Sequence, residues 1–326
     1  MASKLNMANL QTKIEKAERL SEEWGVNLYI KRDDQTGSEI SGNKIRKLEY
    51  LLKEALDGGF DTIITTGGIQ SNHCRATAAA ATMLGLKTVL LLRISEPPRV
   101  EGNYFLDKLF GAEVRFCTPD EYKESRDAIM AGIANELNGK GRKCYVIPEG
   151  ASSGLGSMGY YGAMEEICNQ EKETGIKFDT IVVAVGSGGT YSGLCIANKA
   201  LRLNKRVIGF AVCDDSEYFT NRIDKINQEA GRLAGKEWNM TTADIEIKDK
   251  YVGIGYALSR PEELKFIAEI SSKEALVLDP VYTGKAMYGL YNEIKAGNVA
   301  AGSNILFIHT GGLYGLFPKQ GQFDFM

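Results

Sequence analysis

The feature that most constrains the fold of this chain is a regular alternation of short apolar runs with longer amphipathic stretches. Asp61–Thr66 is a β-branched run typical of a buried strand, and the Ala-rich stretch Asn72–Leu84 is typical of a helix that ends at Gly85. Apolar strands separated by helices indicate βαβ units, in which helices cover both faces of a parallel sheet. The alternation therefore predicts an α/β protein with parallel twisted sheets flanked by helices.

The same patterns predict most of the secondary structure. Strands are expected at Val26–Lys31, Asp61–Thr66, Thr88–Leu92, Glu113–Phe116, Lys143–Ile147, Thr180–Val185, Val207–Val212 and Asn304–His309. Helices are expected at Lys44–Gly58, Asn72–Leu84, Asn103–Phe110, Tyr122–Leu137, Thr190–Ala200, Phe219–Gly235, Pro261–Ser272 and Gly284–Ala296. The glycine-rich segment Gly150–Gly159 is expected to be a hinge or a ligand loop.

Length and charge limit the class of protein. A chain of 326 residues is long enough for about two domains, with joins expected near Gly42 and near Gly150–Gly159. A net charge of −3 argues against a nucleic-acid partner, which usually needs a basic face. No apolar run is long enough to span a membrane, and the N-terminal segment MASKLNMANLQTKIEKAERL has no apolar signal core. We therefore expect a cytoplasmic protein without nucleic-acid or membrane partners.

Residues that bind metal ions are sparse. The chain has only two histidines, His73 and His309, and its six cysteines form no CxxC pair. A catalytic zinc site usually takes three protein ligands, most often two or three of them histidines. No metal site is expected.

One lysine stands at an unusual place for its charge. Lys44 follows Ser41-Gly42-Asn43 at the start of a predicted helix, where the helix dipole disfavours a cation. Residues that go against a local preference are expected at functional sites, and a lysine amine can form a Schiff base with an aldehyde cofactor. Most lysines are solvated surface charges, so that interpretation stays open for Lys44 at this point.

A glycine-rich turn follows a predicted buried strand. Its residues, Gly186-Ser187-Gly188-Gly189-Thr190, open a helix, and backbone N–H groups at such a turn can hold a phosphate. The turn lacks both the GxGxxG pattern and the Lys-Ser/Thr of a Walker loop, which favours a single phosphate over a nucleotide diphosphate. A plain glycine-rich turn explains the segment equally well.

Polar residues gather at three other predicted element ends. Ser71-Asn72-His73 begins a helix and can bind a carboxylate or a cofactor oxygen, or simply cap the helix. His309-Thr310 follows a strand, and ligands of open α/β sheets bind at the carboxyl ends of strands. Tyr282-Thr283-Gly284-Lys285 begins the last predicted helix, and Lys285 is expected on the surface of that helix.

Five motifs, in order and over almost the whole chain, resemble one family. SGNKIRKLEYLL, GGIQSNHCRATAAAA, GSGGT, DPVYTGKAM and FIHTGG are similar to the enzymes that group 1-aminocyclopropane-1-carboxylate (ACC) deaminase with D-cysteine desulfhydrase. The resemblance implies pyridoxal 5′-phosphate as cofactor, a small amino acid as substrate, and fold type II, the fold of tryptophan synthase β. It also implies a large cofactor-binding domain of residues 1–43 and 160–326, a small α/β domain of residues 44–159, and a homodimer.

The resemblance implies roles for particular residues, with Lys44 as the Schiff-base lysine and Ser71 near the substrate carboxylate. The catalytic residues would be Lys44, Tyr282 and Ser71. The cofactor would contact Lys44, Asn43, Asn72, Gly186, Ser187, Gly188, Gly189, Thr190, Tyr282 and Thr310. The substrate would contact Ser71, Asn72, His73, Gly150 and Thr283.

Two positions separate members of this family. ACC deaminases resemble VYEGK and HLGG at the last two motifs, whereas this chain has Thr283 and Thr310 in place of the Glu and the Leu, as in D-cysteine desulfhydrases. A neutral threonine beside the pyridine nitrogen would leave that nitrogen largely unprotonated, and β-elimination needs less electron storage than ring opening. We therefore expect D-cysteine to give pyruvate, hydrogen sulfide and ammonia, with Lys44 or Tyr282 removing the Cα proton.

Other activities on the same scaffold stay open. Cysteate, β-chloroalanine, D-serine and ACC are alternative substrates, and a non-catalytic member that only binds ligands is a further alternative. Two departures from the family pattern bear on this choice. Gln11-Thr12-Lys13 replaces a PTP-like triplet, and Glu149 stands in a segment that more often looks like PVGGSN in desulfhydrases. Glu149 would place an extra carboxylate near the mouth of the site.

Overall fold

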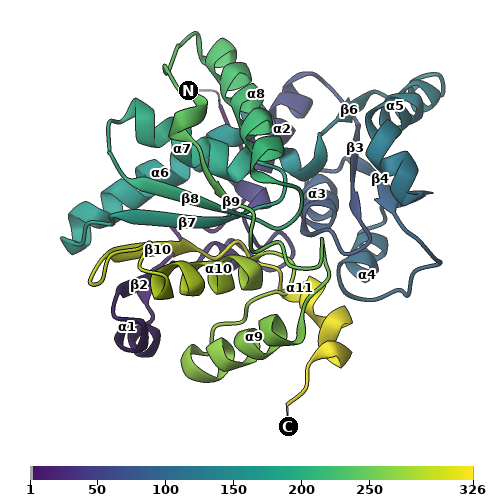
Figure 1. Ribbon diagram of the computed structural model, residues 1–326. Coiled ribbons are helices and arrows are strands. Elements are labelled where there is room, and N and C mark those ends of the chain that lie inside the picture. Colours follow the sequence, from purple (N-terminus) through teal and green to yellow (C-terminus); the bar gives the residue numbers. More distant parts are fainter. Residues whose placement is uncertain (1–2, 326) are drawn as a thin grey trace.

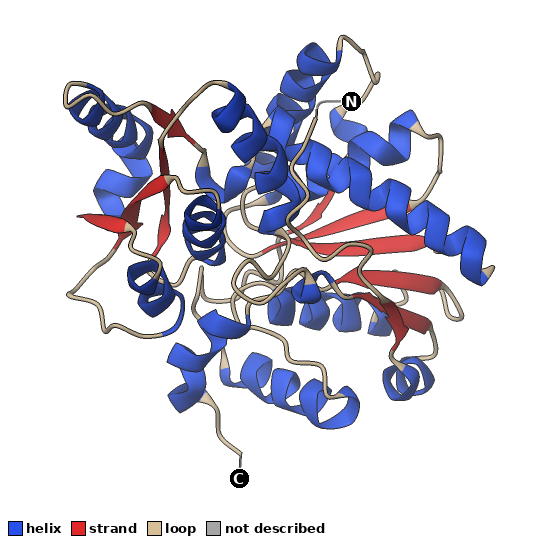
Figure 2. Ribbon diagram, turned by 180° about the vertical axis from the view of Figure 1, so that it is seen from behind, coloured by secondary structure: helices blue, strands red, loops and turns tan. Residues whose placement is uncertain are grey.

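The computed structural model describes residues 3–325, and within that range the strands form a six-stranded and a four-stranded sheet flanked by helices (Figures 1 and 2). The strands are β1 (Ile14–Lys16), β2 (Asn27–Lys31), β3 (Thr62–Gly68), β4 (Lys87–Arg93), β5 (Glu113–Cys117), β6 (Cys144–Val146), β7 (Thr180–Val185), β8 (Arg206–Ala211), β9 (Glu246–Lys248) and β10 (Asn304–Ile308). The α-helices are α1 (Glu18–Trp24), α2 (Lys44–Asp57), α3 (Asn72–Met83), α4 (Gly102–Leu109), α5 (Pro119–Asn138), α6 (Gly154–Thr174), α7 (Gly189–Ala200), α8 (Ser216–Ala234), α9 (Pro261–Glu274), α10 (Thr283–Lys295) and α11 (Leu313–Leu316). Short 3-10 helices are η1 (Asp33–Gln35), η2 (Glu149–Ala151), η3 (Thr242–Asp244) and η4 (Phe317–Gln322).

The predicted α/β class is confirmed, and the predicted elements lie within a few residues of the observed ones. The large sheet has the order β1-β2-β10-β7-β8-β9 and the small sheet the order β5-β4-β3-β6. All pairings are parallel except at one edge, where β1 runs antiparallel to β2 with Ile14 opposite Lys31. The sequence pattern missed β1 because three residues without an apolar run carry no strand signal.

Helices cover both faces of the large sheet because its strands are apolar on both sides. Alternate residues of β7 point to opposite faces. Val182 packs with residues of α1, α9 and α10, whereas Ile181 and Val183 pack with residues of α6, α7 and α8. Figure 1 shows these two helical layers above and below the strands. Within residues 3–325, no helix combines the length and apolarity needed to cross a membrane.

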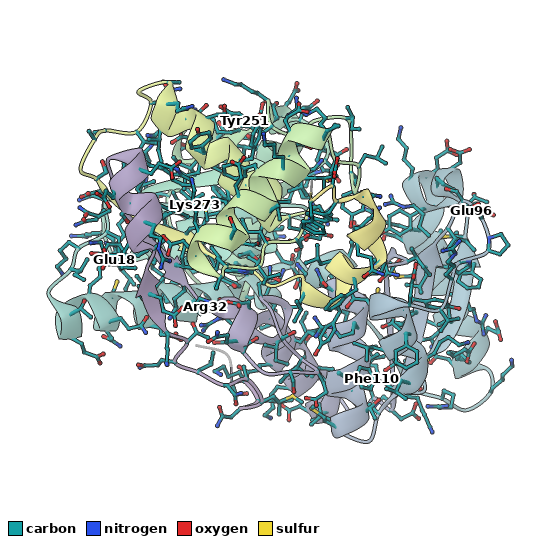
Figure 3. The ribbon with its side chains drawn as sticks, turned by 90° about the horizontal axis from the view of Figure 1, so that it is seen from below. Glu18, Arg32, Glu96, Phe110, Tyr251 and Lys273 are labelled. Carbon is teal, nitrogen blue, oxygen red and sulfur yellow. The ribbon has the colours of Figure 1, made fainter. Side chains whose placement is uncertain are left out.

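The small sheet is covered in the same way. Val89 and Leu91 of β4 pack against α5, while Leu90 and Leu92 pack against α3 and α4. We call this part, residues 62–146, the small lobe, and the large sheet with its helices the large lobe. Figure 3 shows Glu96 and Phe110 on the small lobe, away from Glu18 and Lys273 on the large lobe.

The two sheets can be compared with the predicted domain limits. The strands of the small sheet all fall within residues 44–159, and those of the large sheet all fall outside that range. Helix α2, however, packs against α6 of the large lobe as well as against α3 of the small lobe. The division into two domains stays a prediction, and its limits at residues 1 and 326 lie outside the described residues.

The glycine-rich segment Gly150–Gly159 is more regular than expected. The prediction of a hinge or loop is wrong for its second half, because α6 begins at Gly154 and continues to Thr174. The glycines allow close packing instead of breaking the helix. A Cβ atom on Gly159 would lie 2.3 Å from the carbonyl oxygen of Arg46, so a side chain at this position would separate α6 from α2.

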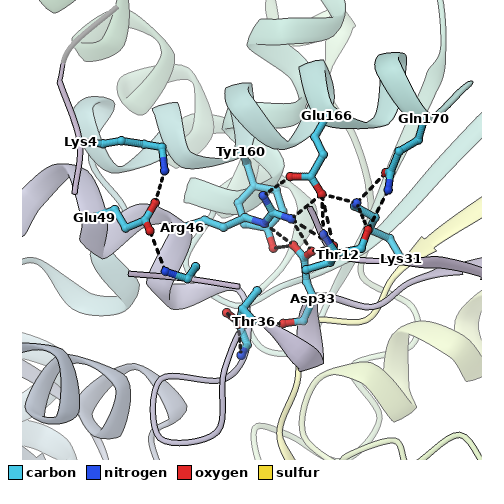
Figure 4. A network of polar contacts seen from close by, with 12 residues as sticks. Lys4, Thr12, Lys31, Asp33, Thr36, Arg46, Glu49, Tyr160, Glu166 and Gln170 are labelled. Carbon is cyan, nitrogen blue, oxygen red and sulfur yellow. Dashed lines mark hydrogen bonds and ion pairs between the residues drawn. The ribbon is translucent and has the colours of Figure 1, made fainter. Parts of the chain in front are cut away.

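A buried ionic cluster joins α2, α6 and the segment after β2 (Figure 4). The Arg46 guanidinium lies 2.8 Å from Asp33 and 2.9 Å from Glu166. Lys31 also pairs with Glu166, and Tyr160 donates to Asp33 at 2.5 Å. Burial is the largest single influence and would raise the pKa of the Asp33 carboxyl, but Arg46, Lys31 and Tyr160 together hold that pKa below its usual value. The cluster therefore consists of charges that are buried and mutually satisfied.

Removing one partner of this cluster is expected to be costly. Arg46→Met leaves two carboxylates buried without their shared cation, which should lower the free energy of unfolding by about 3–5 kcal/mol. The matched control is Arg115→Met, which removes an arginine from the surface pairs with Glu113 and Glu136. That change should cost less than about 1 kcal/mol. Equal shifts of the two variants in chemical denaturation would contradict the importance of the cluster.

Candidate active site

A cavity of about 680 Å³ lies at the carboxyl ends of strands from both sheets. Gly67-Gly68 and Arg93 end β3 and β4 of the small lobe, and Val185 ends β7 of the large lobe. This is the edge of open α/β sheets at which ligands bind. The volume is in the range of small-molecule sites. The position and size of the cavity therefore indicate a site for a cofactor or a substrate.

The cavity brings together most of the residues predicted from sequence. Its lining includes Asn43, Lys44, Ser71, Asn72, His73, Gly150, Gly186, Ser187, Gly188, Thr190, Tyr282 and Thr310. Gly189 and Thr283 are not among the lining residues. Gly189 still belongs to the turn whose other residues line the cavity, whereas Thr283 lies behind it.

Lys44 is the first residue of α2, and the turn before it rests on the end of β10. The Asn43 N–H donates to the Thr310 carbonyl at 3.1 Å. Gly42 has a φ of 101°, and a Cβ atom there would lie 2.8 Å from the same carbonyl, so this turn requires glycine. Burial lowers the pKa of the Lys44 amine to about 8, although Glu149 and Asp279 favour its charged form. About a tenth of the amine is therefore uncharged at pH 7, far more than for an ordinary lysine with a pKa of about 10.4.

The glycine-rich turn faces the cavity from the large lobe. Gly188 has a φ of 89° and caps α7, whose first N–H groups have no partner within the helix. The Gly189 N–H donates to Ser152 Oγ at 3.1 Å, and that oxygen lies 2.8 Å from Ser187 Oγ. Asn43 Nδ2 donates to Thr190 Oγ1 at 2.9 Å, which links this turn to the Lys44 turn. The arrangement can hold an anion of the size of phosphate.

The start of α3 supplies a second set of donors. Ser71 caps the helix, because its hydroxyl oxygen accepts the Cys74 N–H at 3.1 Å. Asn72 Oδ1 accepts a bond of 2.9 Å from Asn103, which leaves the Asn72 NH₂ group as a donor at the cavity. His73 lies 2.8 Å from Thr65 Oγ1 and 3.4 Å from a second threonine hydroxyl. Neither ring nitrogen of His73 is therefore free for a substrate.

Two tyrosine side chains meet at the cavity wall. The hydroxyls of Tyr256 and Tyr282 lie 2.6 Å apart. Burial and the neighbouring Tyr256 raise the pKa of Tyr282 well above its ordinary value. Tyr282 is therefore a neutral phenol at physiological pH, able to donate a hydrogen bond but poorly suited to remove a proton.

The two threonines singled out by the sequence differ in position. Thr310 lines the cavity, whereas the Thr283 side chain is completely buried. Thr283 Oγ1 donates to Asp279 Oδ1 at 2.8 Å and accepts the Asp279 N–H at 2.8 Å. The structure thus does not bring the expected substrate contact Thr283 to the cavity. The prediction for Lys285 is wrong, because this lysine is buried and donates to the carbonyls of Val252 and Gly255.

The sequence analysis singled out Glu149 but missed several other residues that line the cavity. They lie at the end of β4, on the first turns of α5, on α7, on and just before α8, and in the loop between β9 and α9, where a polar residue looks like any surface residue. Tyr122 donates to Glu149 Oε1 at 2.7 Å, and Arg126 lies 3.0 Å from Glu149 Oε2. The missed lining residues that carry a charge or a hydroxyl are Arg93, Asp120, Tyr122, Lys123, Arg126, Tyr191, Asp214, Tyr218, Arg222 and Tyr256.

The charge of the cavity is positive. Its lining contains five lysines and arginines but three aspartates and glutamates. Lys47, behind the lining, donates to the Gly150 carbonyl, and burial lowers the pKa of its amine well below the ordinary value. No group of three or more His, Cys, Asp or Glu side chains within residues 3–325 could hold a metal ion. The excess of positive charge in the lining favours anionic ligands.

Comparison with known proteins agrees with these features. The model of the family described as "Pyridoxal-phosphate dependent enzyme" matches residues 5–311. The mitochondrial bifunctional D-cysteine desulfhydrase/1-aminocyclopropane-1-carboxylate deaminase of Arabidopsis thaliana is 45% identical over 307 residues, which cover 91% of this chain and 75% of that protein. The D-cysteine desulfhydrase of Serratia proteamaculans (strain 568) is 38% identical over 324 residues, which cover 98% of this chain and 96% of that protein.

A solved structure shows the same fold. The crystal structure described as that of "the ACC deaminase homologue" is 41% identical to this chain and superimposes with a TM-score of 0.90. The match covers 98% of this chain and 94% of the other. These findings confirm the family resemblance carried by the five motifs, fold type II, and the cofactor that the resemblance implies.

The lowered pKa of Lys44 can be measured in the cofactor-free protein. Labelling by a small amine reagent, followed by peptide mass spectrometry, should show Lys44 becoming reactive as the pH rises through about 8, because only the uncharged amine reacts. Glu149→Gln should move this midpoint to lower pH, because the Glu149 charge favours the ammonium form. The exposed Lys87 in the same digest serves as the reference for reagent reactivity. A midpoint for Lys44 at the ordinary lysine value of about 10.4 would contradict its burial.

Proposed function

We propose that this chain, which belongs to the family of pyridoxal-phosphate-dependent enzymes, catalyses β-elimination on a small amino acid, with D-cysteine giving pyruvate, hydrogen sulfide and ammonia. The observation that carries the proposal is the placement of Lys44. An amine with a pKa of about 8 lies in the same cavity as the glycine-rich turn and the α3 N-terminus. These features supply an attachment point, a phosphate site and a carboxylate site.

The residues of the cavity fit the cofactor. The turn from Gly186 to Thr190 and the N-terminus of α7 would hold the phosphate through backbone N–H groups. A Cβ atom on Gly186 would lie 3.0 Å from the Tyr282 ring, so the space beside this ring depends on glycine. Lys44 would carry the cofactor aldehyde, and the Asn72 amide would donate to a cofactor oxygen. When bound, pyridoxal phosphate takes up the electron pair of the broken Cα–H bond.

The protein side chains orient the substrate. The first N–H groups of α3 lack partners within the helix, and together with Ser71 they would bind the substrate carboxylate. No cation would then be needed to hold the carboxylate at the helix start. The Lys44 amine would stay available as the attachment point and the base. Figures 1 and 2 show α3 between the two sheets, where it can present its first turn to the cavity.

Lys44 is the better candidate for removing the Cα proton. Its pKa of about 8 is close to operating pH, which is the condition for an efficient general base. Tyr282 is held as a neutral phenol and would donate a hydrogen bond instead. As the Cα proton goes to the Lys44 amine, the Cβ–S bond breaks and its electron pair leaves on sulfur. The released three-carbon enamine hydrolyses to pyruvate and ammonia.

The choice of D-cysteine rests on Thr310 more than on Thr283. Thr310 lies in the cavity and offers a hydroxyl group where ACC deaminases carry a leucine. Thr283 does not line the cavity, so it would influence the substrate only indirectly, through its hydrogen bonds with Asp279. ACC deamination is the second candidate, because the Arabidopsis relative carries both activities in its name. The homodimer, the cytoplasmic location and the domain limits at residues 44–159 belong to the same proposal.

Product assays test the proposed reaction. The purified holoenzyme should release sulfide and pyruvate from D-cysteine faster than it releases 2-oxobutyrate from ACC. Lys44→Ala should abolish sulfide release while the protein keeps its cooperative unfolding, because the attachment point and the base are lost together. Faster release of 2-oxobutyrate from ACC would show that ACC, and not D-cysteine, is the preferred substrate. A yellow holoenzyme that releases neither keto acid would indicate a ligand-binding member of the family.

The phosphate site can be tested independently of turnover. Gly188→Val places a side chain 3.2 Å from Ile223 at a residue with a φ of 89°, so the turn must shift and cofactor affinity should fall at least about tenfold. The matched control is Gly85→Val, which imposes the same kind of strain at a φ of 73° on an exposed turn with no neighbour within 4 Å. Cofactor dissociation constants from absorbance titration provide the comparison. Unchanged affinity in Gly188→Val would rule out this turn as the phosphate site.

A further inference from the structure

Arg93 occupies a special position among the cations of the cavity. It is the last residue of β4, it is half-buried and it lines the cavity. Its guanidinium carbon lies 4.8 Å from the centre of the Tyr122 ring and 5.3 Å from the centre of the Tyr256 ring. Contacts of this kind orient a guanidinium group without using its N–H donors. The side chain is thus held in place by two aromatic rings.

The N–H donors of Arg93 are unused within residues 3–325, where the side chain makes no hydrogen bond and no ion pair. The acid closest to its ring partners, Glu149, is already bonded to Tyr122 and paired with Arg126. Arg222 is also engaged, because its Nε donates to the Ser187 carbonyl at 2.9 Å. Arg93 is therefore an oriented cation whose five N–H donors are free for a ligand.

The neighbours of Arg93 show which part of a ligand it can reach. Gly68 of β3 is paired with Arg93 of β4, and neighbouring strands lie about 4.8 Å apart. Gly68 leads directly into Ser71 and the start of α3, where we place the substrate carboxylate. Arg93 therefore lies one strand to the side of that carboxylate. A Cβ atom on Gly68 would lie 3.7 Å from a terminal guanidinium nitrogen of Arg93, so this group lies beside the segment that leads to Ser71.

We propose that Arg93 binds the group on the β-carbon of the substrate and stabilises it as it departs as an anion. The inference rests on the proposed function and defines its substrate class as three-carbon amino acids whose β-substituent is an anion or leaves as one. In the D-cysteine reaction the Cβ–S bond breaks, and the electron pair goes to sulfur, which leaves as HS⁻ beside the guanidinium. No oxidant or reductant is needed. Charge-assisted bonds from arginine suit this role.

This assignment also explains the presence of Glu149. Its carboxylate binds the Tyr122 hydroxyl at 2.7 Å and so fixes one of the two rings that orient Arg93. It also pairs with Arg126, an arginine of α5 that lines the cavity. Glu149 thus acts as a positioning residue for Arg93, and its charge is neutralised by Arg126.

Binding of two unreactive amino acids tests the proposal. D-Aspartate carries an anion on its β-carbon and D-alanine carries only hydrogen there, and neither has a leaving group for elimination. Dissociation constants are measured from the cofactor absorbance of the holoenzyme. Arg93→Gln should weaken D-aspartate at least about tenfold, as expected for a lost charge-assisted bond. D-Alanine should change less than about twofold, and Arg93→Lys should fall between wild type and Arg93→Gln for D-aspartate.

Arg115→Gln is the matched control, because it removes an arginine charge from the neighbouring strand β5 outside the cavity. It should leave both dissociation constants unchanged. Equal weakening of both amino acids by Arg93→Gln would show that Arg93 binds the α-carboxylate, and no weakening of either would show that it does not contact the substrate. Each result overturns the proposal. A wild-type enzyme that releases no sulfide from D-cysteine would refute the proposed function, while the D-aspartate titration would still decide the role of Arg93.

Discussion

The cavity depends on the buried ion cluster around Arg46 more than on any other interaction. Arg46 lies two residues after Lys44, and its guanidinium joins Asp33 of the segment after β2 to Glu166 of α6 (Figure 4). Three parts of the chain far apart in sequence are thereby held around the first turn of α2. Buried ion pairs add little net stability over well-packed apolar residues, but an unpaired buried charge is costly. The cluster therefore specifies where the turn before Lys44 lies.

Burial and the N-termini of two helices determine the chemical properties of the cavity around Lys44. Burial lowers the pKa of the Lys44 amine to about 8, which is the property that the proposed nucleophile and base requires near neutral pH. The N-termini of α3 and α7 present N–H groups that have no partner within their helices, one set suited to a carboxylate and the other to a phosphate. Arg93 adds a free cation between two tyrosine rings. In the proposed function, the protein would supply attachment, orientation and charge, and the cofactor would supply the electron sink.

Much of this arrangement could be predicted from sequence because it depends on local patterns. The strand and helix periods predicted the α/β class, and polar residues at helix starts marked Lys44, Ser71 and the glycine-rich turn as candidates. The family resemblance then grouped these candidates in one site. Contacts that depend on tertiary packing could not be predicted. Lys285 was expected on the surface, yet it is buried because two loop carbonyls accept its N–H groups. Arg93 looked like any residue at a strand end, since its partners come from two distant segments.

The central claim is that the cofactor is attached to Lys44. Borohydride reduction of the holoenzyme, followed by proteolysis and mass spectrometry, fixes the pyridoxyl group to the lysine that carries it. The account predicts a single modified peptide that contains Lys44. Lys47 is the most demanding alternative, because burial also lowers the pKa of its amine well below the ordinary value and it lies close to the same cavity. A pyridoxyl group on Lys47 or on Lys285 would contradict the account.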